Sequence, residues 1–233
     1  KIIIPIENSL AGRVADIHYL IPKYKLQIHA EHFQKVNHNL LGIKGSKMKD
    51  IKTVRSHSQA IGQCSKIILN NNLKPIISAD TAGSAKFVSE KKDKTESAIA
   101  SELAAKIYNL EILKSNIEDE PGNITRFFIM GNNSEHPEVG NKKYITSCIF
   151  KLKSIPAALY KALGGFATNG VNLCKLESFS VKNTFDQVNF YIDIEGHIED
   201  PALKKALEEL GFHTQKLDVL GVYEAHKFRS QNK

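Results

Sequence analysis

The chain has 233 residues, of which 42% are hydrophobic and 24% charged, a balance typical of a globular protein with room for one large or two modest domains. No run of 18 apolar residues occurs and the opening apolar run is too short for a signal-peptide core, so we expect a cytoplasmic protein and exclude a membrane span. The net charge of +7 is spread evenly, and its one dense cluster (Lys44, Lys47, Lys49, Lys52 and Arg55) lacks the interleaved aromatic residues of a nucleic-acid site, so we expect no nucleic-acid partner.

The first 140 residues alternate between helical and strand-like segments. We expect helices over 66–74 and 96–110, and strands over 26–29, 74–78 and 125–130. This alternation is typical of an α/β layer structure. Because the chain lacks an initiator methionine and opens on an apolar strand-like run, we expect it to begin inside a folded unit.

A polar, turn-rich segment separates this region from a second one. Residues 131–143 have little to bury, so we place the domain boundary there, with residues 134–142 as the linker. The following segments alternate as strand 144–152, a helix from Ser154 to Asn169-Gly170, strands 171–181 and 187–194, a helix over 201–210 ended by Gly211, and strand 216–224. The order βαββαβ predicts a ferredoxin-like unit.

Two features suggest metal or disulfide chemistry at first sight. Three cysteines, Cys64, Cys148 and Cys174, are far apart and odd in number, so we interpret them as small buried hydrophobes. The pair His29 and His32 has His-x-x-His spacing, but a strand would point the two imidazoles to opposite faces. We therefore predict no metal site.

The chain begins with a strand that ends in polar residues. Glu7, Asn8 and Ser9 follow the apolar run, and open α/β sheets bind ligands at the carboxyl ends of their strands. The alternative is that Asn8 and Ser9 cap a helix.

Two capped helices follow. Ser56 is a candidate N-cap, with Gln59 and Gln63 on one face of the helix that it opens. Free N–H groups at helix N-termini attract anions. His57 alone is more often a structural hydrogen-bonding residue than a base. A second cap at Asp80 precedes small residues that allow a ligand carboxylate to approach the backbone, although helix packing explains them equally well: Thr81, Ala82, Gly83 and Ser84.

A Pro-Gly turn then feeds an apolar strand that begins with a hydroxyl and a permanent cation. The segment runs Pro121-Gly122-Asn123-Ile124-Thr125-Arg126-Phe127-Phe128-Ile129. A turn entering a strand is a rigid place from which to aim a polar pair at a small anion.

The Thr-Arg-Phe segment resembles the signature of prephenate dehydratases, which decarboxylate and dehydrate prephenate to phenylpyruvate on the way to phenylalanine. Four other motifs stand in that family's order: 5–9, 56–64, 80–85 and 98–105, the last expected to be a packing helix of small residues. Residues 143–228, with Asn169-Gly170-Val171-Asn172-Leu173 and Glu177-Ser178, resemble an ACT domain, a module that binds amino acids.

The resemblance implies an incomplete two-lobed, periplasmic-binding-protein-like catalytic domain over 1–133, followed by a ferredoxin-like ACT domain over 143–228. It assigns catalysis to Thr125, Asn8, Ser56 and Gln63. Arg126 and the helices beginning at Ser56 and Thr81 would hold the two substrate carboxylates, because a guanidinium offers two parallel donors. The remaining substrate-binding residues are Glu7, Ser9, Ala82, Gly83, Ser84 and Phe127. No cofactor is implied.

The ACT resemblance implies feedback inhibition by L-phenylalanine at a dimer interface, and a homodimer or homotetramer. The implied contacts are Ala157, Ala158, Leu159, Asn169, Gly170, Val171, Asn172, Leu173, Glu177 and Ser178. This sequence departs from the family at Ala157, where Gly is usual, at Phe179-Ser180, where Arg-Pro is usual, and at Ser58, where Pro is usual. The first two departures predict altered phenylalanine control. The alternatives are arogenate dehydratase, the same reaction on the transaminated substrate, and a non-catalytic amino-acid sensor.

Overall fold

A computed structural model describes residues 1–14, 17–132, 136–180 and 188–231. Its helices and strands fall into two compact units. Unit 1 comprises residues 1–8, 12–34 and 126–233, and unit 2 comprises residues 9–11 and 35–125. The division does not follow the predicted 134–142 linker, because the first strands pack with the C-terminal region in unit 1. Among the described residues, none of the helices combines the length and apolarity needed to cross a membrane.

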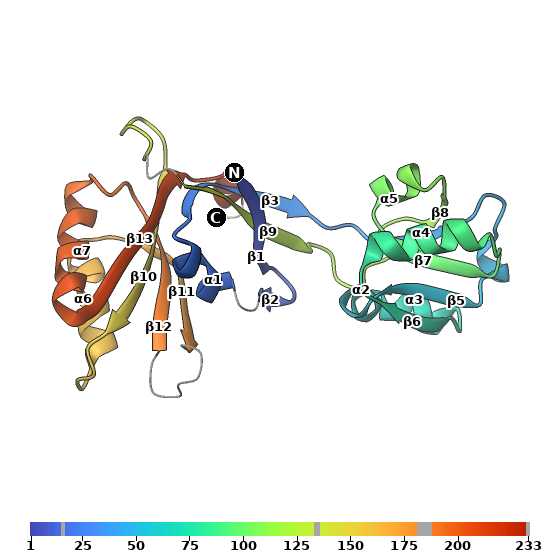
Figure 1. Ribbon diagram of the computed structural model, residues 1–233, viewed down its shortest axis with the longest axis horizontal. Helices are drawn as coiled ribbons and strands as arrows, with labels where there is room; N and C mark the ends of the chain where they lie inside the picture. Colours follow the sequence, from blue (N-terminus) through green and yellow to red (C-terminus); the bar gives the residue numbers. More distant parts are fainter. Residues whose placement is uncertain (15–16, 133–135, 181–187, 232–233) are drawn as a thin grey trace. The chain divides into compact units, whose positions relative to one another are not determined.

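Unit 2 is a five-stranded mixed sheet with helices on both faces (Figure 1). Its strand order is β6-β5-β7-β4-β8, in which β5 runs parallel to β6 and β7, and β4 runs antiparallel to β7 and β8. The strands are β4 (Asn39–Gly42), β5 (Thr53–His57), β6 (Lys74–Ser78), β7 (Glu96–Ala100) and β8 (Glu111–Lys114). The helices are η1 (Met48–Asp50), α2 (Ser58–Gln63), α3 (Ser65–Asn70), α4 (Thr81–Lys91) and α5 (Glu102–Ile107).

The two faces of the unit 2 sheet bury separate apolar cores. Leu40 and Ile99 pack on one face with α2 and α3, and their neighbours Leu41 and Ala98 pack on the other with α4 and α5. This alternation follows from the two-residue period of a strand. The helix predicted over 96–110 is therefore wrong in its first half: Glu96–Ala100 is a fully buried strand, whose continuous run of small and apolar residues does not distinguish strand from helix.

Unit 1 is built from three layers. A four-stranded sheet of order β2-β1-β9-β3 contains β1 (Ile2–Asn8), β2 (Gly12–Arg13), β3 (Gln27–Lys35) and β9 (Ile124–Gly131), with helix α1 (Ile17–Tyr24) beside it. A second sheet, of order β11-β12-β10-β13, packs on it. The second sheet contains β10 (Tyr144–Leu152), β11 (Leu173–Ser180), β12 (Val188–Glu195) and β13 (Thr214–Glu224).

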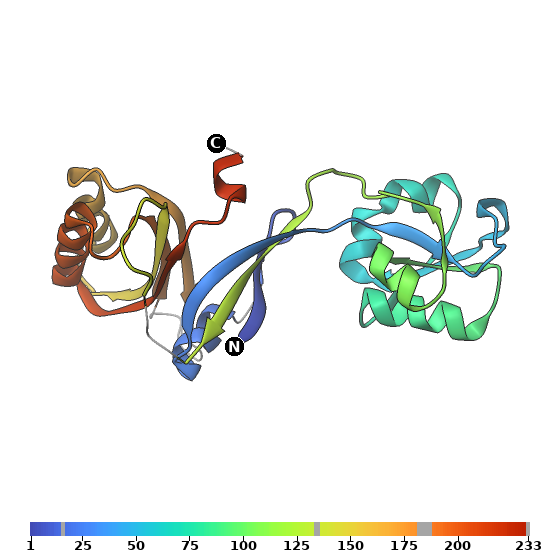
Figure 2. The same ribbon diagram turned by 90° about the horizontal axis from the view of Figure 1, so that it is seen from above.

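Helices α6 (Ala158–Thr168) and α7 (Pro201–His213) cover the other face of the second sheet (Figures 1 and 2). A short helix, α8 (Phe228–Gln231), ends the described chain. Chain order and antiparallel pairing reproduce the predicted βαββαβ arrangement. We call β10–β13 with α6 and α7 the βαββαβ sheet unit.

The two sheets of unit 1 share one apolar core. Phe128 and Met130 of β9 pack with Tyr191 of β12 and Tyr223 of β13. The sheets approach each other closely at Gly221, where an added Cβ would overlap the carbonyl group of Ile28. A glycine is therefore required there by space.

Several predicted boundaries shift. The helix expected from Ser154 begins at Ala158, because Ala157 adopts a left-handed conformation (φ +59°) and cannot join it. The helix expected to end at Gly211 continues to His213. Its start at Pro201 and the end of α6 before Asn169-Gly170 are confirmed. Residues 181 and 187, the predicted ends of two strands, lie outside the described residues.

Candidate active site

Arg126 lies in a buried ion cluster within unit 1. Only 3% of the residue is exposed, and its Nε donates to Oε2 of Glu31 at 2.9 Å. Its NH1 donates to Oδ2 of Asp193 at 2.6 Å, and its NH2 donates to the Tyr223 hydroxyl at 3.0 Å. Arg229 also binds Glu31, at 2.6 Å through Nε, so two guanidinium groups face two carboxylates whose side chains are fully buried.

The cluster fixes the charge state of its members. Burial alone would raise the pKa of Asp193, but Arg126 and hydrogen bonds from Ser147 and Tyr191 outweigh it and hold that pKa below its usual value. Burial and the Asp193 carboxylate together raise the pKa of Tyr191 and Tyr223. Asp193 is therefore ionised and both tyrosines are protonated near neutral pH.

These contacts argue against the prediction that Arg126 holds a substrate carboxylate. Its donors are directed at Glu31, Asp193 and Tyr223, and side chains on successive residues of a strand point to opposite faces. Thr125 therefore lies on the other face of β9, together with half-buried Phe127. The hydroxyl and the cation are adjacent in sequence but do not form a side-by-side pair.

Thr125 follows a segment of unit 2 that hydrogen bonds hold in place. Asn123 is 2% exposed, and its Nδ2 donates to Oε1 of Gln63 at 2.7 Å. The same Gln63 oxygen lies 2.8 Å from Nε2 of His38. The Ser9 hydroxyl donates to the Gly122 carbonyl group and accepts from the Ile124 N–H group, both at 2.9 Å. Gln63 and Ser9 thus position the segment that leads into Thr125.

Ser56 does not cap a helix. It lies in β5, is fully buried, and its hydroxyl donates to the Ile99 carbonyl group at 2.7 Å. The cap of α2 is His57, whose Nδ1 accepts from the Gln59 N–H group at 3.3 Å. The structure therefore corrects the predicted cap, and the Ser56 hydroxyl joins two strands.

Helix α4 begins at Thr81 with Asp80 as its cap, as predicted. The Asp80 carboxylate accepts from the Gly83 N–H group at 2.5 Å, and the buried Ser84 hydroxyl donates to the Asp80 carbonyl group at 2.7 Å. A Cβ on Gly83 would lie 2.8 Å from the same carboxylate. The small residue accommodates the protein's own capping group, so Gly83 and Ser84 do not offer these groups to an anion. Thr81 is half-buried and Ala82 exposed.

Glu7 and Asn8 end strand β1 in unit 1. Glu7 Oε2 lies 2.6 Å from Nζ of Lys175 and 3.6 Å from NH1 of Arg126. Asn8 is half-buried at the carboxyl end of the strand, as the sequence predicted. Glu7 is thus paired with the protein's own cations, which argues against direct binding of an anionic substrate.

The residues predicted to bind phenylalanine fall in two places in unit 1. Ala157 is the N-cap of α6, Ala158 and Leu159 begin the helix, and a turn with φ +65° at Gly170 leads from α6 into β11. Asn169 in this turn donates to Oε1 of Glu209 at 3.0 Å. Val171 and Asn172 complete the turn, Leu173 begins β11, and Asn172 accepts from the Glu195 N–H group through its carbonyl oxygen at 2.9 Å.

Glu177 lies further along β11 and has only 17% of its side chain exposed. Its carboxylate lies 3.2 Å from both Lys175 and Arg13, and 3.8 Å from Nε2 of His18. The carbonyl group of Ser178 accepts from Arg13 at 3.1 Å. Glu177 is therefore turned toward α1 and β2.

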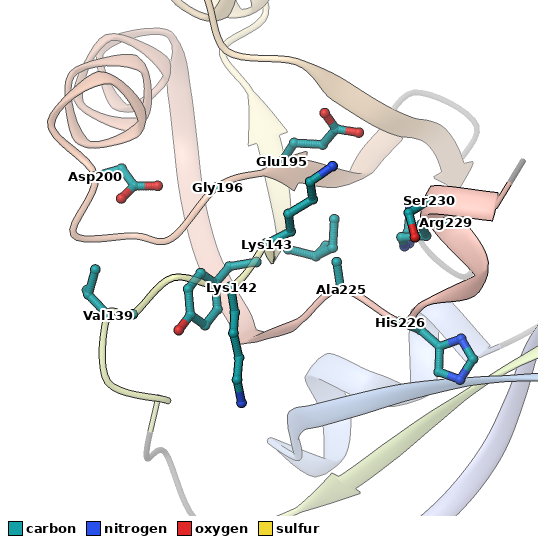
Figure 3. A pocket seen from close by; sticks show the side chains of 13 residues that line it. Val139, Lys142, Lys143, Glu195, Gly196, Asp200, Ala225, His226, Arg229 and Ser230 are labelled. Carbon is teal, nitrogen blue, oxygen red and sulfur yellow. The ribbon is translucent and has the colours of Figure 1, made fainter. Parts of the chain in front are cut away.

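A pocket of about 360 Å³ in unit 1 contains none of the predicted site residues (Figure 3). It is lined by the start of β10, the ends of β12 and β13, and α8. Lys142 and Arg229 on its wall are paired with Glu224 and Glu31 respectively. A smaller pocket, of about 230 Å³, is lined by Glu7, Phe33, Arg126, Cys174, Lys175, Glu195, Phe228 and Arg229.

The cysteine prediction holds for two residues. Cys64 and Cys148 are buried, and burial raises the pKa of the Cys64 thiol to about 12. Cys174 is exposed, and its Sγ accepts from NH1 of Arg229 at 3.2 Å, so the prediction is wrong there.

Sequence reasoning missed four residues that organise these clusters. Asn123 stands in the same motif as Thr125, and its position two residues earlier in the chain was a usable signal. Asp193 interrupts an apolar strand with a charge, which also marks a buried ion pair. Glu31 and Lys175 carried no comparable signal, because their partners are far away in sequence.

Comparison with known proteins identifies the family. The model of the prephenate dehydratase family matches residues 1–135. A bifunctional N-acyl-homoserine lactone acylase/prephenate dehydratase of Komagataeibacter europaeus is 45% identical over 96% of this chain and 79% of its own length. An arogenate dehydratase/prephenate dehydratase of Arabidopsis thaliana is 37% identical over 96% of this chain and 60% of its own length.

A solved structure agrees. Prephenate dehydratase from Arthrobacter aurescens in complex with L-Phe has a TM-score of 0.85 and 29% identity, and covers 96% of this chain and 74% of that one. The mixed α/β fold is thus that of a class of biosynthetic lyases. The chain belongs to the prephenate dehydratase family.

Proposed function

We propose that this chain contributes the active site for the decarboxylating dehydration of prephenate to phenylpyruvate. Family membership supports this, and the single observation that carries the site is the Gln63–Asn123 hydrogen bond of 2.7 Å, which fixes the segment entering Thr125. Loss of carbon dioxide and hydroxide makes the substrate ring aromatic, so the substrate itself supplies the driving force. The protein must orient the substrate and assist the leaving hydroxyl group.

Thr125 is the proposed donor to that hydroxyl group. A threonine hydroxyl is a weak acid, so it acts as a positioned hydrogen-bond donor and not by full proton transfer. Its strand is held from both sides, by Gln63 and Ser9 before it and by the Arg126 cluster after it. We assign Asn8 to a direct polar contact with substrate, and Thr81, Ala82 and Phe127 to the proposed substrate-binding surface.

Ser9, Ser56 and Gln63 become positioning residues in this proposal. Each directs its described hydrogen bonds to protein groups: Ser9 to Gly122 and Ile124, Ser56 to Ile99, and Gln63 to Asn123 and His38. Substitution of any of them is expected to act on turnover through Thr125 or the strands around it.

The βαββαβ sheet unit is the proposed regulatory module, an ACT domain that binds L-phenylalanine and assembles a homodimer or homotetramer. Its topology and the phenylalanine complex named for the Arthrobacter relative support this. The methyl group of Ala157 and the Phe179-Ser180 segment lead us to propose weaker phenylalanine control than in relatives with Gly and Arg-Pro.

Arogenate is the second candidate substrate, since the Arabidopsis relative is named for both substrates. Full-length protein assayed with prephenate and arogenate, following phenylpyruvate and phenylalanine as products, tests the proposal. Turnover of prephenate is the expected result, and turnover of arogenate alone would reassign the substrate. Turnover of neither substrate, with phenylalanine binding retained, would favour the sensor instead.

A further inference from the structure

Asn8 and Thr125 each have a charged neighbour that binds the βαββαβ sheet unit. Glu7 precedes Asn8, and its Oε2 lies 2.6 Å from Nζ of Lys175 on β11. Arg126 follows Thr125, and its NH1 lies 2.6 Å from Oδ2 of Asp193 on β12. All four of these charged groups belong to unit 1.

The four charged residues form a ring of alternating sign, with ion contacts on three sides and a backbone register on the fourth. Lys175 and Asp193 are register partners on adjacent strands β11 and β12. On the facing sheet, Glu7 Oε2 and Arg126 NH1 are 3.6 Å apart. Side-chain exposure falls from 35% at Glu7 and 18% at Lys175 to 4% at Arg126 and zero at Asp193. Solvent therefore screens the Arg126–Asp193 ion pair least and the Glu7–Lys175 ion pair most.

Lys175 is the branch point of the ring. Its ammonium lies 2.6 Å from Glu7 and 3.2 Å from Oε2 of Glu177, so one cation is shared between two carboxylates. Arg13 is a second cation at Glu177, 3.2 Å from Oε1 and 44% exposed. The side of the ring that ends in Arg126 and Asp193 is buried and is held by further contacts of Arg126 with Glu31 and of Arg229 with Asp193, so it serves as the fixed anchor.

We propose that Lys175 transmits amino-acid binding at Glu177 to Asn8. The inference rests on the proposed function, since it takes Glu177 as an effector residue and Asn8 as a catalytic one. A ligand ammonium group that binds Glu177 competes with Lys175, and Lys175 then pairs with Glu7 alone. The altered ion pair between Lys175 and Glu7 shifts the position of the next residue, Asn8, or restricts its motion. A ligand changes an equilibrium only through such a difference in contacts.

The relay predicts that loss of Lys175 weakens inhibition by phenylalanine without weakening phenylalanine binding. In full-length protein with prephenate as substrate, Lys175→Met should bind L-phenylalanine at least as tightly as the unsubstituted protein by calorimetry. The phenylalanine concentration for half-inhibition should nevertheless rise at least about tenfold, which corresponds to a coupling loss of about 1.4 kcal/mol. Lys175→Arg keeps the cation and should restore inhibition.

Lys216→Met is the matched control. Lys216 lies on β13 of the same sheet and has its own partner, Asp218, at 2.5 Å, but it does not contact the ring. It should leave inhibition unchanged. If Lys175→Met does not fold, Lys175→Gln tests the same relay and should raise the phenylalanine concentration for half-inhibition without weakening phenylalanine binding.

The outcomes separate the relay from the enzyme. An unsubstituted protein that converts prephenate but ignores phenylalanine overturns the relay and leaves the proposed function intact. The relay is also overturned if Lys175→Met is half-inhibited at the same phenylalanine concentration as the unsubstituted protein. A protein that converts neither substrate overturns the proposed function, and the relay with it.

Discussion

Thr125 and Arg126 are consecutive residues of β9 that serve opposite faces of the strand. Arg126 is 3% exposed and bound to Glu31, Asp193 and Tyr223, whereas Thr125 is half-buried on the other side. A single peptide bond thus joins a proposed catalytic hydroxyl to a buried ion cluster. The conformational freedom of Thr125 is limited by contacts that Thr125 itself does not make.

Thr125→Ala should lower prephenate turnover by orders of magnitude while leaving the thermal unfolding midpoint almost unchanged. The substitution removes one partly buried hydroxyl group, and loss of a transition-state donor costs about 10²–10³ in turnover at comparable sites. Steady-state kinetics and a thermal melt measure the two effects. Thr53→Ala, on β5 of the same unit, is the control and should keep activity. Near-normal turnover of Thr125→Ala would remove Thr125 from the mechanism.

Arg126→Met should destabilise the protein by about 3–5 kcal/mol, because it leaves Glu31 and Asp193 buried with less compensation. Urea unfolding measures the loss. Lys142→Met breaks the exposed pair with Glu224 and should cost much less, because solvent screens exposed ion pairs. Equal losses in the free energy of unfolding for the two variants would show that the buried cluster stabilises the protein no more than an exposed ion pair does.

The fold could be predicted where local pattern and tertiary structure agree. Strand 144–152 and the start of α7 at Pro201 match because a run of β-branched and aromatic residues and an N-terminal proline are local signals. Strand Glu96–Ala100 could not be distinguished from helix, since a strand buried on both faces loses its alternation.

The site was harder to predict than the fold. Resemblance assigned roles to Thr125 and Gln63, but it did not show that Gln63 reaches the strand through Asn123. The role of Arg126 was missed because its partners Glu31 and Asp193 are 95 and 67 residues away in the chain. Side-chain type indicates which chemistry is possible, while long-range contacts determine whether a group is available for it.

Ala157→Gly and Ala167→Gly should change stability in opposite directions. Ala157 has φ +59°, where a Cβ costs roughly 1–2 kcal/mol, so glycine relieves strain, partly offset by its greater freedom in the unfolded chain. Ala167 is an exposed residue within α6, and glycine there should cost roughly 0.5–1 kcal/mol. Chemical denaturation of both variants measures the difference. Destabilisation by Ala157→Gly equal to that by Ala167→Gly would contradict a strain at residue 157.

The same Ala157→Gly variant should bind phenylalanine more tightly if the alanine methyl group crowds the proposed effector site. Calorimetry compares it with the unsubstituted protein, and Ala167→Gly again serves as the control. Tight, selective phenylalanine binding by the unsubstituted protein would contradict the proposed weakening.

Stability should fall as the pH drops below about 6.5, through His18 of α1. His18 is 3% exposed, and neither ring nitrogen has a hydrogen-bond partner among the described residues. Burial lowers its pKa from 6.5; Lys175 and Arg13 act in the same direction, while Glu177 and Asp193 oppose them.

A lowered pKa means that the unfolded chain binds the proton more readily than the folded one. His18 therefore contributes its full stability above pH 6.5 and loses it as the pH falls through that value toward the folded-state pKa. Urea unfolding at pH 7.5 and 5.5 should show a loss of stability at the lower pH that His18→Leu abolishes. His213→Gln, on α7, is the control and should keep the loss. An unchanged pH dependence in His18→Leu would show that His18 is protonated in the folded protein or is not the group responsible.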